Sequence, residues 1–189
     1  MSTRHLRTPR LDLVPATAAH LRAELVSREA LAQELSVDVP PTWPPELYDE
    51  DAIRYSLAWV LAHPDQAAWW GFHYIVRRPV TLEPPLLIGT GGFKGAPDEH
   101  GSIELGYGIL PEHQGRGYAT EAVQGWVAFA FASPAVRTVV AQTLPHLTPS
   151  IRVLEKAGFT FVGEGHDRHA PAGERVIRYQ RRRDEESNV

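Results

Sequence analysis

One stretch of the sequence decides the fold: residues 106–122, which read GYGILPEHQGRGYATEA. Alternating apolar and polar residues predict a strand over residues 102–109, and this strand leads into the turn at residues 114–118. An apolar run after the turn predicts a helix over residues 119–131, which ends at Ser133 and Pro134. A strand that passes through a glycine turn directly into a helix forms an anion site. The first N–H groups of a helix have no partner within it, and the helix dipole adds positive potential there.

Four residues of this turn favour an anionic ligand. Gly115 and Gly117 permit unusual backbone angles and a close approach of the backbone to a ligand, and Arg116 adds a positive charge. Thr120 can hydrogen-bond a phosphate oxygen or cap the helix. The alternative is a capped turn that binds nothing, because short glycine patterns match by accident. The chain has no P-loop, and in residues 89–94 a lysine occupies the third glycine position of a dinucleotide fingerprint.

The segments on both sides of this stretch alternate between strand-like and helix-like patterns, which favours an α+β fold. We expect strands over residues 10–14, 69–76, 86–93, 102–109, 138–143, 160–164 and 174–180. We expect helices over residues 17–26, 49–63, 119–131 and 149–157, with a stiff proline loop at residues 37–45. The 189 residues, 43% of them hydrophobic, predict one domain over residues 1–183 and an acidic tail over residues 184–189.

Composition argues against several classes of protein. The formal net charge is −4, and the basic run at residues 181–183 is followed at once by acidic residues, so no nucleic-acid partner is expected. No run approaches the roughly 18 apolar residues that span a bilayer, so no membrane partner is expected. The start of the chain does not resemble a secretory signal. Without cysteine there is no disulfide framework and no thiol nucleophile, and a cytoplasmic enzyme is the simplest interpretation.

Several motifs, in order, resemble one known family. The spacing Gln114-x-x-Gly117-x-Ala119 is similar to the Gln/Arg-x-x-Gly-x-Gly/Ala signature of the GNAT acetyltransferases. Residues 150–159, SIRVLEKAGF, resemble the second motif of that family, and residues 103–107 resemble the strand before the signature. Residues 8–13, TPRLDL, are similar to the opening strand of its RimJ/RimL branch, which acetylates protein N-termini.

The resemblance implies a fold and a co-substrate. The fold is a strongly twisted, mostly antiparallel mixed sheet flanked by helices, with a V-shaped gap between the strands at residues 102–109 and 138–143. The co-substrate is acetyl-CoA, which lies in this gap with its pyrophosphate on the turn. The implied contacts are the backbone amides near Ile109 and Leu110, the turn residues Gln114, Gly115, Arg116, Gly117, Tyr118, Ala119 and Thr120, and the loop residues Leu147 and Ser150. Leu147 departs from the asparagine that the family commonly has there, which puts one contact to the pantetheine arm in doubt.

The resemblance also assigns two catalytic residues. Glu104 is the expected general base, acting through a water, and its alternative role is a salt bridge on the strand surface. Ser150 is the expected acid, or a hydrogen-bond donor to the leaving sulfur, and its alternative role is helix capping. Many members use a tyrosine four residues later, but here that position is Leu154.

The implied reaction is direct attack of a primary amine on acetyl-CoA in a ternary complex. The acceptor is a protein N-terminus, by resemblance to the branch, or a small-molecule amine. Trp43, Trp70 and His73 are candidates for lining the acceptor site, with core packing as the alternative for the tryptophans. No metal is expected, because His166 and His169 lack a third ligand.

Two rival functions remain open. One is a non-catalytic acyl-CoA-binding sensor or scaffold, which Leu147 and the missing tyrosine favour slightly and which Glu104 with Ser150 opposes. The other is a turn that binds a nucleotide or another phosphate compound. A homodimer is also left open by the resemblance, and no sequence feature establishes it.

Overall fold

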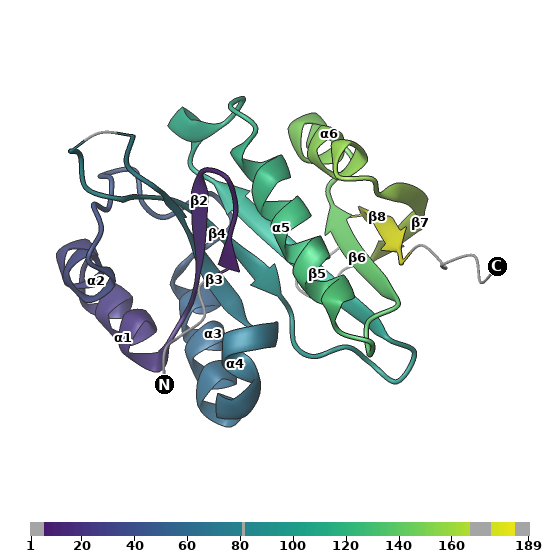
Figure 1. Ribbon diagram of the computed structural model, residues 1–189, viewed down its shortest axis with the longest axis horizontal. Helices are drawn as coiled ribbons and strands as arrows, with labels where there is room; N and C mark the ends of the chain where they lie inside the picture. Colours follow the sequence, from purple (N-terminus) through teal and green to yellow (C-terminus); the bar gives the residue numbers. More distant parts are fainter. Residues whose placement is uncertain (1–5, 81, 167–174, 184–189) are drawn as a thin grey trace.

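The computed structural model describes residues 6–80, 82–166 and 175–183. Its core is an eight-stranded sheet in the order β1-β2-β3-β4-β5-β6-β8-β7 (Figure 1). The strands are β1 (Leu6–Arg7), β2 (Leu11–Pro15), β3 (Phe72–Arg77), β4 (Leu86–Phe93), β5 (Ser102–Ile109), β6 (Thr138–Thr143), β7 (Thr160–His166) and β8 (Arg175–Arg182). Neighbouring strands are antiparallel except β5 and β6, which run parallel. The predicted α+β class with a mixed, mostly antiparallel sheet is confirmed.

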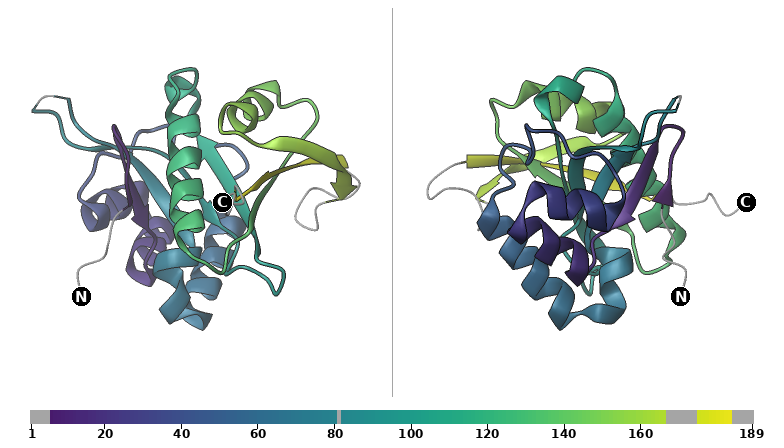
Figure 2. Two further views of the ribbon diagram at one scale, coloured as in Figure 1. Left: turned by 45° about the vertical axis from the view of Figure 1, so that its right-hand side comes forward. Right: turned by 90° about the vertical axis from the view of Figure 1, so that its left-hand side faces the viewer.

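Helices cover both faces of the sheet (Figure 2). They are α1 (Ala18–Val26), α2 (Arg28–Leu35), α3 (Glu50–Ala62), α4 (Pro64–Trp70), α5 (Tyr118–Ala132) and α6 (Thr148–Lys156), with a short 3-10 turn η1 (Pro111–His113) before α5. Two separate apolar clusters result. The sheet packs against α5 and α6 in one cluster, and against the helices of residues 18–70 in the other. The sheet therefore separates two apolar cores.

The position of α5 follows from its sequence. Its buried residues are Ala122, Val123, Trp126, Val127 and Ala130, which recur at the helical period and form one apolar stripe against the sheet. Gly117 caps its N-terminus in the left-handed conformation, with φ of 79°. Ser133 ends the helix with an extended backbone. The turn before α5 is thereby fixed at the end of β5.

The sheet opens between β5 and β6. Their register runs from Ser102 opposite Thr138 to Leu105 opposite Ala141 and stops there. Beyond that point β5 stays paired with β4 up to Ile109, and β6 stays paired with β8 up to Thr143. Each strand thus follows its outer neighbour, and the two diverge toward the start of α5. This is the V-shaped gap that the resemblance implied.

Besides η1, three short elements were not expected from the sequence. Ser27 caps α2 by accepting a hydrogen bond from the Ala30 amide at 3.1 Å, so a second helix follows α1 directly. Pro64 ends α3 and also begins α4, because proline is tolerated in a first helical turn. The strand expected over residues 69–76 is present as β3, but its predicted start was wrong, since α4 continues to Trp70 and β3 begins at Phe72. The third element, β1, is a two-residue strand that pairs with β2.

No helix within residues 6–80, 82–166 and 175–183 is long and apolar enough to cross a membrane. These same residues contain no group of three or more potential metal ligands. His169 and the predicted tail at residues 184–189 lie outside the described residues.

Candidate active site

The turn after β5 has the geometry of an anion site. Gly115 and Gly117 both have left-handed backbones, with φ of 71° and 79°. A β-carbon added at Gly115 would meet no heavy atom within 4 Å, so the turn is open to solvent there. The first α5 amide with a carbonyl partner one turn back is that of Glu121, which donates to Gly117 at 3.0 Å. The preceding N–H groups of Tyr118, Ala119 and Thr120 have no such partner within the helix.

Two hydrogen bonds to strand carbonyls fix the position of this turn. The side-chain amide of Gln114 donates to the carbonyl of Ile109 at 2.9 Å, which closes the turn on the end of β5. The amide of Leu110 donates to the carbonyl of Ile88 on β4 at 2.9 Å. The expectation that the Leu110 amide faces the co-substrate is therefore corrected, because β4 already uses that donor. Leu110 itself is fully buried.

Glu104 lies beside the gap, on the face of β5 opposite the buried side chains of Ile103 and Leu105. Its carboxylate forms an ion pair with the Lys94 ammonium at 2.5 Å and accepts a hydrogen bond from the Gln142 side chain at 3.3 Å. Gln142 is on β6, so this contact crosses the opening sheet one residue past its last paired position. The Glu104 side chain as a whole is about 28% exposed. The sequence analysis did not identify Lys94. Its ion pair with Glu104 is the salt bridge that was stated as the alternative role of this residue, and it does not prevent the carboxylate from acting as a base.

Ser150 does not cap α6, which corrects that alternative. The cap position is Leu147, which is half-buried and makes no side-chain cap bond. The Oγ atom of Ser150 instead lies 3.1 Å from the hydroxyl of Tyr107, which also donates to the Ser150 carbonyl at 3.1 Å. Burial raises the pKa of Tyr107 to about 12, against a smaller lowering by the Ser150 hydrogen bond. At neutral pH this phenol is a proton donor.

Tyr107 is a residue that sequence reasoning passed over. It is three residues beyond Glu104 on the same strand, so the two side chains leave β5 on opposite faces. Tyr107 packs on the α5 and α6 side. The one available signal was the position of a tyrosine at the outer end of the strand, close to where the sheet opens.

The three candidates for the acceptor site are not brought together. Trp43 packs in the cluster with α1, while Trp70 contacts Phe93 and Phe129 on the α5 side. His73 is 3% exposed, lies against Trp126, and burial lowers its pKa to about 4. Core packing, the alternative stated for the tryptophans, therefore describes Trp70, and His73 is buried in the same way.

Trp43 belongs to a loop that does reach β5. Pro45 of this loop lies 3.4 Å from the position that a β-carbon on Gly108 would take. Thr42 hydrogen-bonds Glu112 in η1. The loop thus covers the Glu104 face of β5 and touches the segment that leads into the turn.

The half-buried carboxylate of Glu24 anchors this loop. Glu24 of α1 accepts hydrogen bonds from the Trp43 indole at 2.8 Å, the Tyr48 hydroxyl at 3.0 Å and the Tyr74 hydroxyl at 2.7 Å. Burial raises the pKa of Glu24, and the three donors oppose that shift. No motif in the sequence predicted this cluster, because its members come from three separate segments, namely α1, the loop and β3.

Known proteins share this architecture. The uncharacterized N-acetyltransferase p20 of Bacillus licheniformis is 36% identical over 80 residues, which are 42% of this chain and 45% of that protein. The chain thus spans about half the length of the curated relatives it matches. The solved acetyltransferase of Agrobacterium tumefaciens is 26% identical, with a TM-score of 0.62 over 97% of this chain and 96% of that one.

A third similarity concerns the fold alone. RimL, described as a ribosomal L7/L12 alpha-N-protein acetyltransferase in complex with coenzyme A, is 17% identical. Its TM-score is 0.67 over 95% of this chain and 98% of that one.

The family described as Acetyltransferase (GNAT) domain matches residues 10–160, which include the turn, Glu104 and Ser150. The chain therefore belongs to the GNAT acetyltransferase family.

Proposed function

We propose that this protein transfers an acetyl group from acetyl-CoA to a primary amine by direct attack. One observation carries the proposal: the gap between β5 and β6 opens directly onto the glycine turn at the start of α5. A pantetheine arm carries amide groups. Backbone groups of β5 beyond Leu105 have lost their strand partner on the β6 side and need hydrogen bonds. The turn supplies N–H groups and Arg116 for the pyrophosphate.

The two proton transfers of the reaction take place on opposite faces of β5. Glu104, on the loop-covered face, accepts a proton from the attacking amine, through a water. Ser150, on the α6 side, donates a proton to the departing sulfur as the carbon–sulfur bond breaks and the carbon–nitrogen bond forms. Tyr107 orients the Ser150 hydroxyl and replenishes its proton, which its largely protonated phenol permits. Lys94 and Gln142 hold the Glu104 carboxylate at the gap.

For the acceptor we propose a protein N-terminus, with a small-molecule amine as the alternative. Two similarities support this order: the opening TPRLDL segment resembles the RimJ/RimL branch, and the fold resembles that of RimL. The loop with Pro45 over Gly108 lies on the Glu104 face, where the acceptor would approach.

The test is an acetyl-transfer assay with thiol release as the readout. Acetyl-CoA is supplied with a panel of N-terminal peptides, the same peptides with blocked N-termini, and small amines. Multiple turnover with free but not blocked N-termini is the expected result. Binding of acetyl-CoA without turnover on any amine would identify a non-catalytic acyl-CoA-binding module instead.

A further inference from the structure

An open groove of about 600 Å³ lies beside the start of α5. Its walls come from the turn between β1 and β2, from the first two turns of α5 and from the end of α6. The polar side chains that line it include Arg10, Thr120, Glu121 and Lys156, and Gly117 forms part of the wall. The N-terminal β1–β2 hairpin is far from Gly117 in the sequence, but it forms a wall of the groove that Gly117 also lines.

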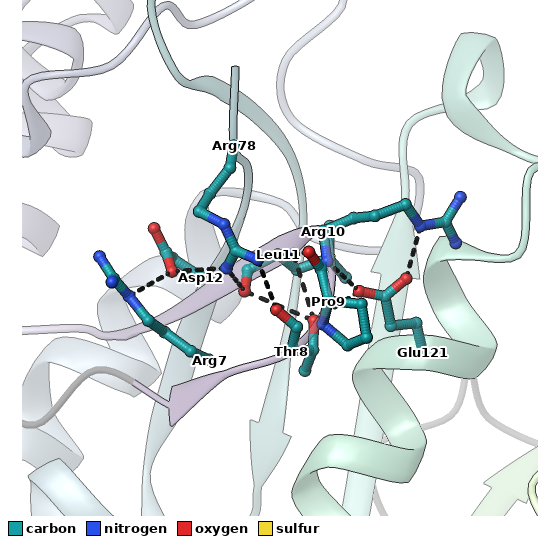
Figure 3. A network of polar contacts seen from close by, with 8 residues as sticks. All are labelled: Arg7, Thr8, Pro9, Arg10, Leu11, Asp12, Arg78 and Glu121. Carbon is teal, nitrogen blue, oxygen red and sulfur yellow. Dashed lines mark hydrogen bonds and ion pairs between the residues drawn. The ribbon is translucent and has the colours of Figure 1, made fainter. Parts of the chain in front are cut away.

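Glu121 ties this hairpin to α5 (Figure 3). Its carboxylate accepts hydrogen bonds from the Thr8 hydroxyl at 2.6 Å, the Arg10 amide at 2.7 Å and the Arg10 Nε at 2.6 Å. Burial acts to raise the pKa of Glu121, but these hydrogen bonds outweigh it, so the pKa is lowered and the carboxylate is charged at neutral pH. Arg78 holds the other side of the hairpin by donating to the carbonyls of Thr8 and Leu11.

The Arg10 guanidinium is held in place from three sides. Its Nε pairs with Glu121, its Nη1 donates to the carbonyl of Arg116 at 3.1 Å, and its centre lies 4.4 Å over the Tyr118 ring. Its remaining nitrogen, Nη2, lies 3.4 Å from where a β-carbon on Gly117 would be. Two nitrogens of Arg10 thus fix the turn, while the third is directed at the surface that Gly117 keeps clear.

We propose that Arg10 is a binding residue for the pyrophosphate of the co-substrate, with Nη2 as the donor and with Glu121 and Tyr118 as the groups that position it. The proposal rests on the proposed function. A pyrophosphate bridge carries two negative charges, and the exposed Arg116 supplies one cation at the turn. Arg10 supplies a second one, already ordered, so little side-chain entropy is lost on binding. Its planar fork holds Glu121 with one nitrogen and presents another to a phosphate oxygen in a fixed geometry, whereas a lysine donates from a single nitrogen on a flexible stem.

The test compares two acetyl donors in the variants Arg10→Ala and Arg10→Lys. Acetyl-CoA contains the pyrophosphate, and acetyl-pantetheine ends before it. We expect Arg10→Ala to raise KM for acetyl-CoA about tenfold with kcat within about twofold, the size of one charge-assisted hydrogen bond. The smaller effect expected of Arg10→Lys is about threefold on KM. For both variants, kcat/KM with acetyl-pantetheine should stay within about twofold of the wild-type value.

The control is Arg54→Ala, which removes an arginine from an ion pair with Glu50 on the surface of α3. This substitution should leave KM and kcat unchanged with both acetyl donors. Equal losses on both donors would show that Arg10 only supports the fold, and unchanged KM for acetyl-CoA would show that it does not touch the ligand. Either result overturns this inference and leaves the proposed function standing. A wild-type protein inactive with acetyl-CoA would overturn both. If Arg10→Ala fails to fold, Arg10→Lys alone decides by the same comparison.

Discussion

The two faces of the sheet carry surfaces that are formed by different physical means. On the α5 face, the turn at residues 114–118 is exposed, shaped by glycines, and offers backbone N–H groups with few side chains. On the opposite face, the loop over β5 is held by Glu24, a carboxylate surrounded by Trp43, Tyr48 and Tyr74. The first surface is built to receive an anion. The second is already satisfied internally and serves to keep a wall in place.

The difference shows how a site can be both open and ordered. An anion site made of backbone needs the correct dihedral angles and little else, so a single added side chain can block it. A wall anchored by a half-buried carboxylate depends on distant donors, and its failure affects stability before chemistry. Substitutions on the two faces should therefore affect different measurements.

The largest effect is expected at Gly117 on the open face. Gly117→Val places a β-branched residue at positive φ, with its β-carbon 3.4 Å from Arg10, and should raise KM for acetyl-CoA by about 100-fold. Steady-state kinetics and the thermal shift caused by acetyl-CoA would measure it. The matched control is Gly165→Val on β7, where no heavy atom lies within 4 Å of the added β-carbon. A normal KM in Gly117→Val would remove the pyrophosphate from this turn.

Glu104→Gln should separate chemistry from binding. We expect kcat to fall about 100-fold at neutral pH, the usual contribution of a general base, with the affinity for acetyl-CoA nearly unchanged. The exposed Glu99→Gln is the control on the neighbouring loop. Unchanged turnover in Glu104→Gln would leave Glu104 as the partner of Lys94 and nothing more.

Tyr107→Phe tests the link between the strand and α6. Loss of its hydroxyl should lower kcat about tenfold, because Ser150 loses the group that orients it. A double-mutant cycle with Ser150→Ala measures whether the two act as one unit, in which case the double variant is no slower than Ser150→Ala alone. Fully additive losses would mean that the 3.1 Å contact has no role in the reaction.

The smallest effect on activity is expected from Glu24→Gln on the closed face, where the signature is the pH dependence of stability. Burial raises the folded-state pKa of Glu24 above its usual 4.5, so the folded protein binds more protons than the unfolded chain just above that pH. The free energy of unfolding contributed by Glu24 therefore falls as pH rises through this interval.

Urea denaturation from pH 4 to 8 should show this slope in the wild type and lose it in Glu24→Gln. The exposed Glu34→Gln variant should keep this slope. A difference in unfolding free energy between the wild type and Glu24→Gln that does not change with pH would contradict this explanation.

The same contrast explains what could be predicted from the sequence. The turn, β5 and α5 are contiguous, so their geometry is encoded locally by glycine positions and by the apolar period, and those predictions hold. The Glu24 cluster joins residues 19, 24 and 50 positions apart, and Arg10 meets Glu121 across 111 positions. No local pattern predicts such contacts. Trp70 and His73 were misplaced for a related reason, since an aromatic residue fits a binding wall and an apolar core equally well.

The most direct test of the central claim is isothermal titration of the wild-type protein with acetyl-CoA, with acetyl phosphate and ADP as controls. The account predicts micromolar binding of acetyl-CoA, about −8 kcal/mol, and much weaker binding of both controls, because the gap and the turn must be filled together. Absence of acetyl-CoA binding, or equal binding of ADP, would contradict the claim that the β5–β6 gap and the Gly117 turn form one acetyl-CoA site.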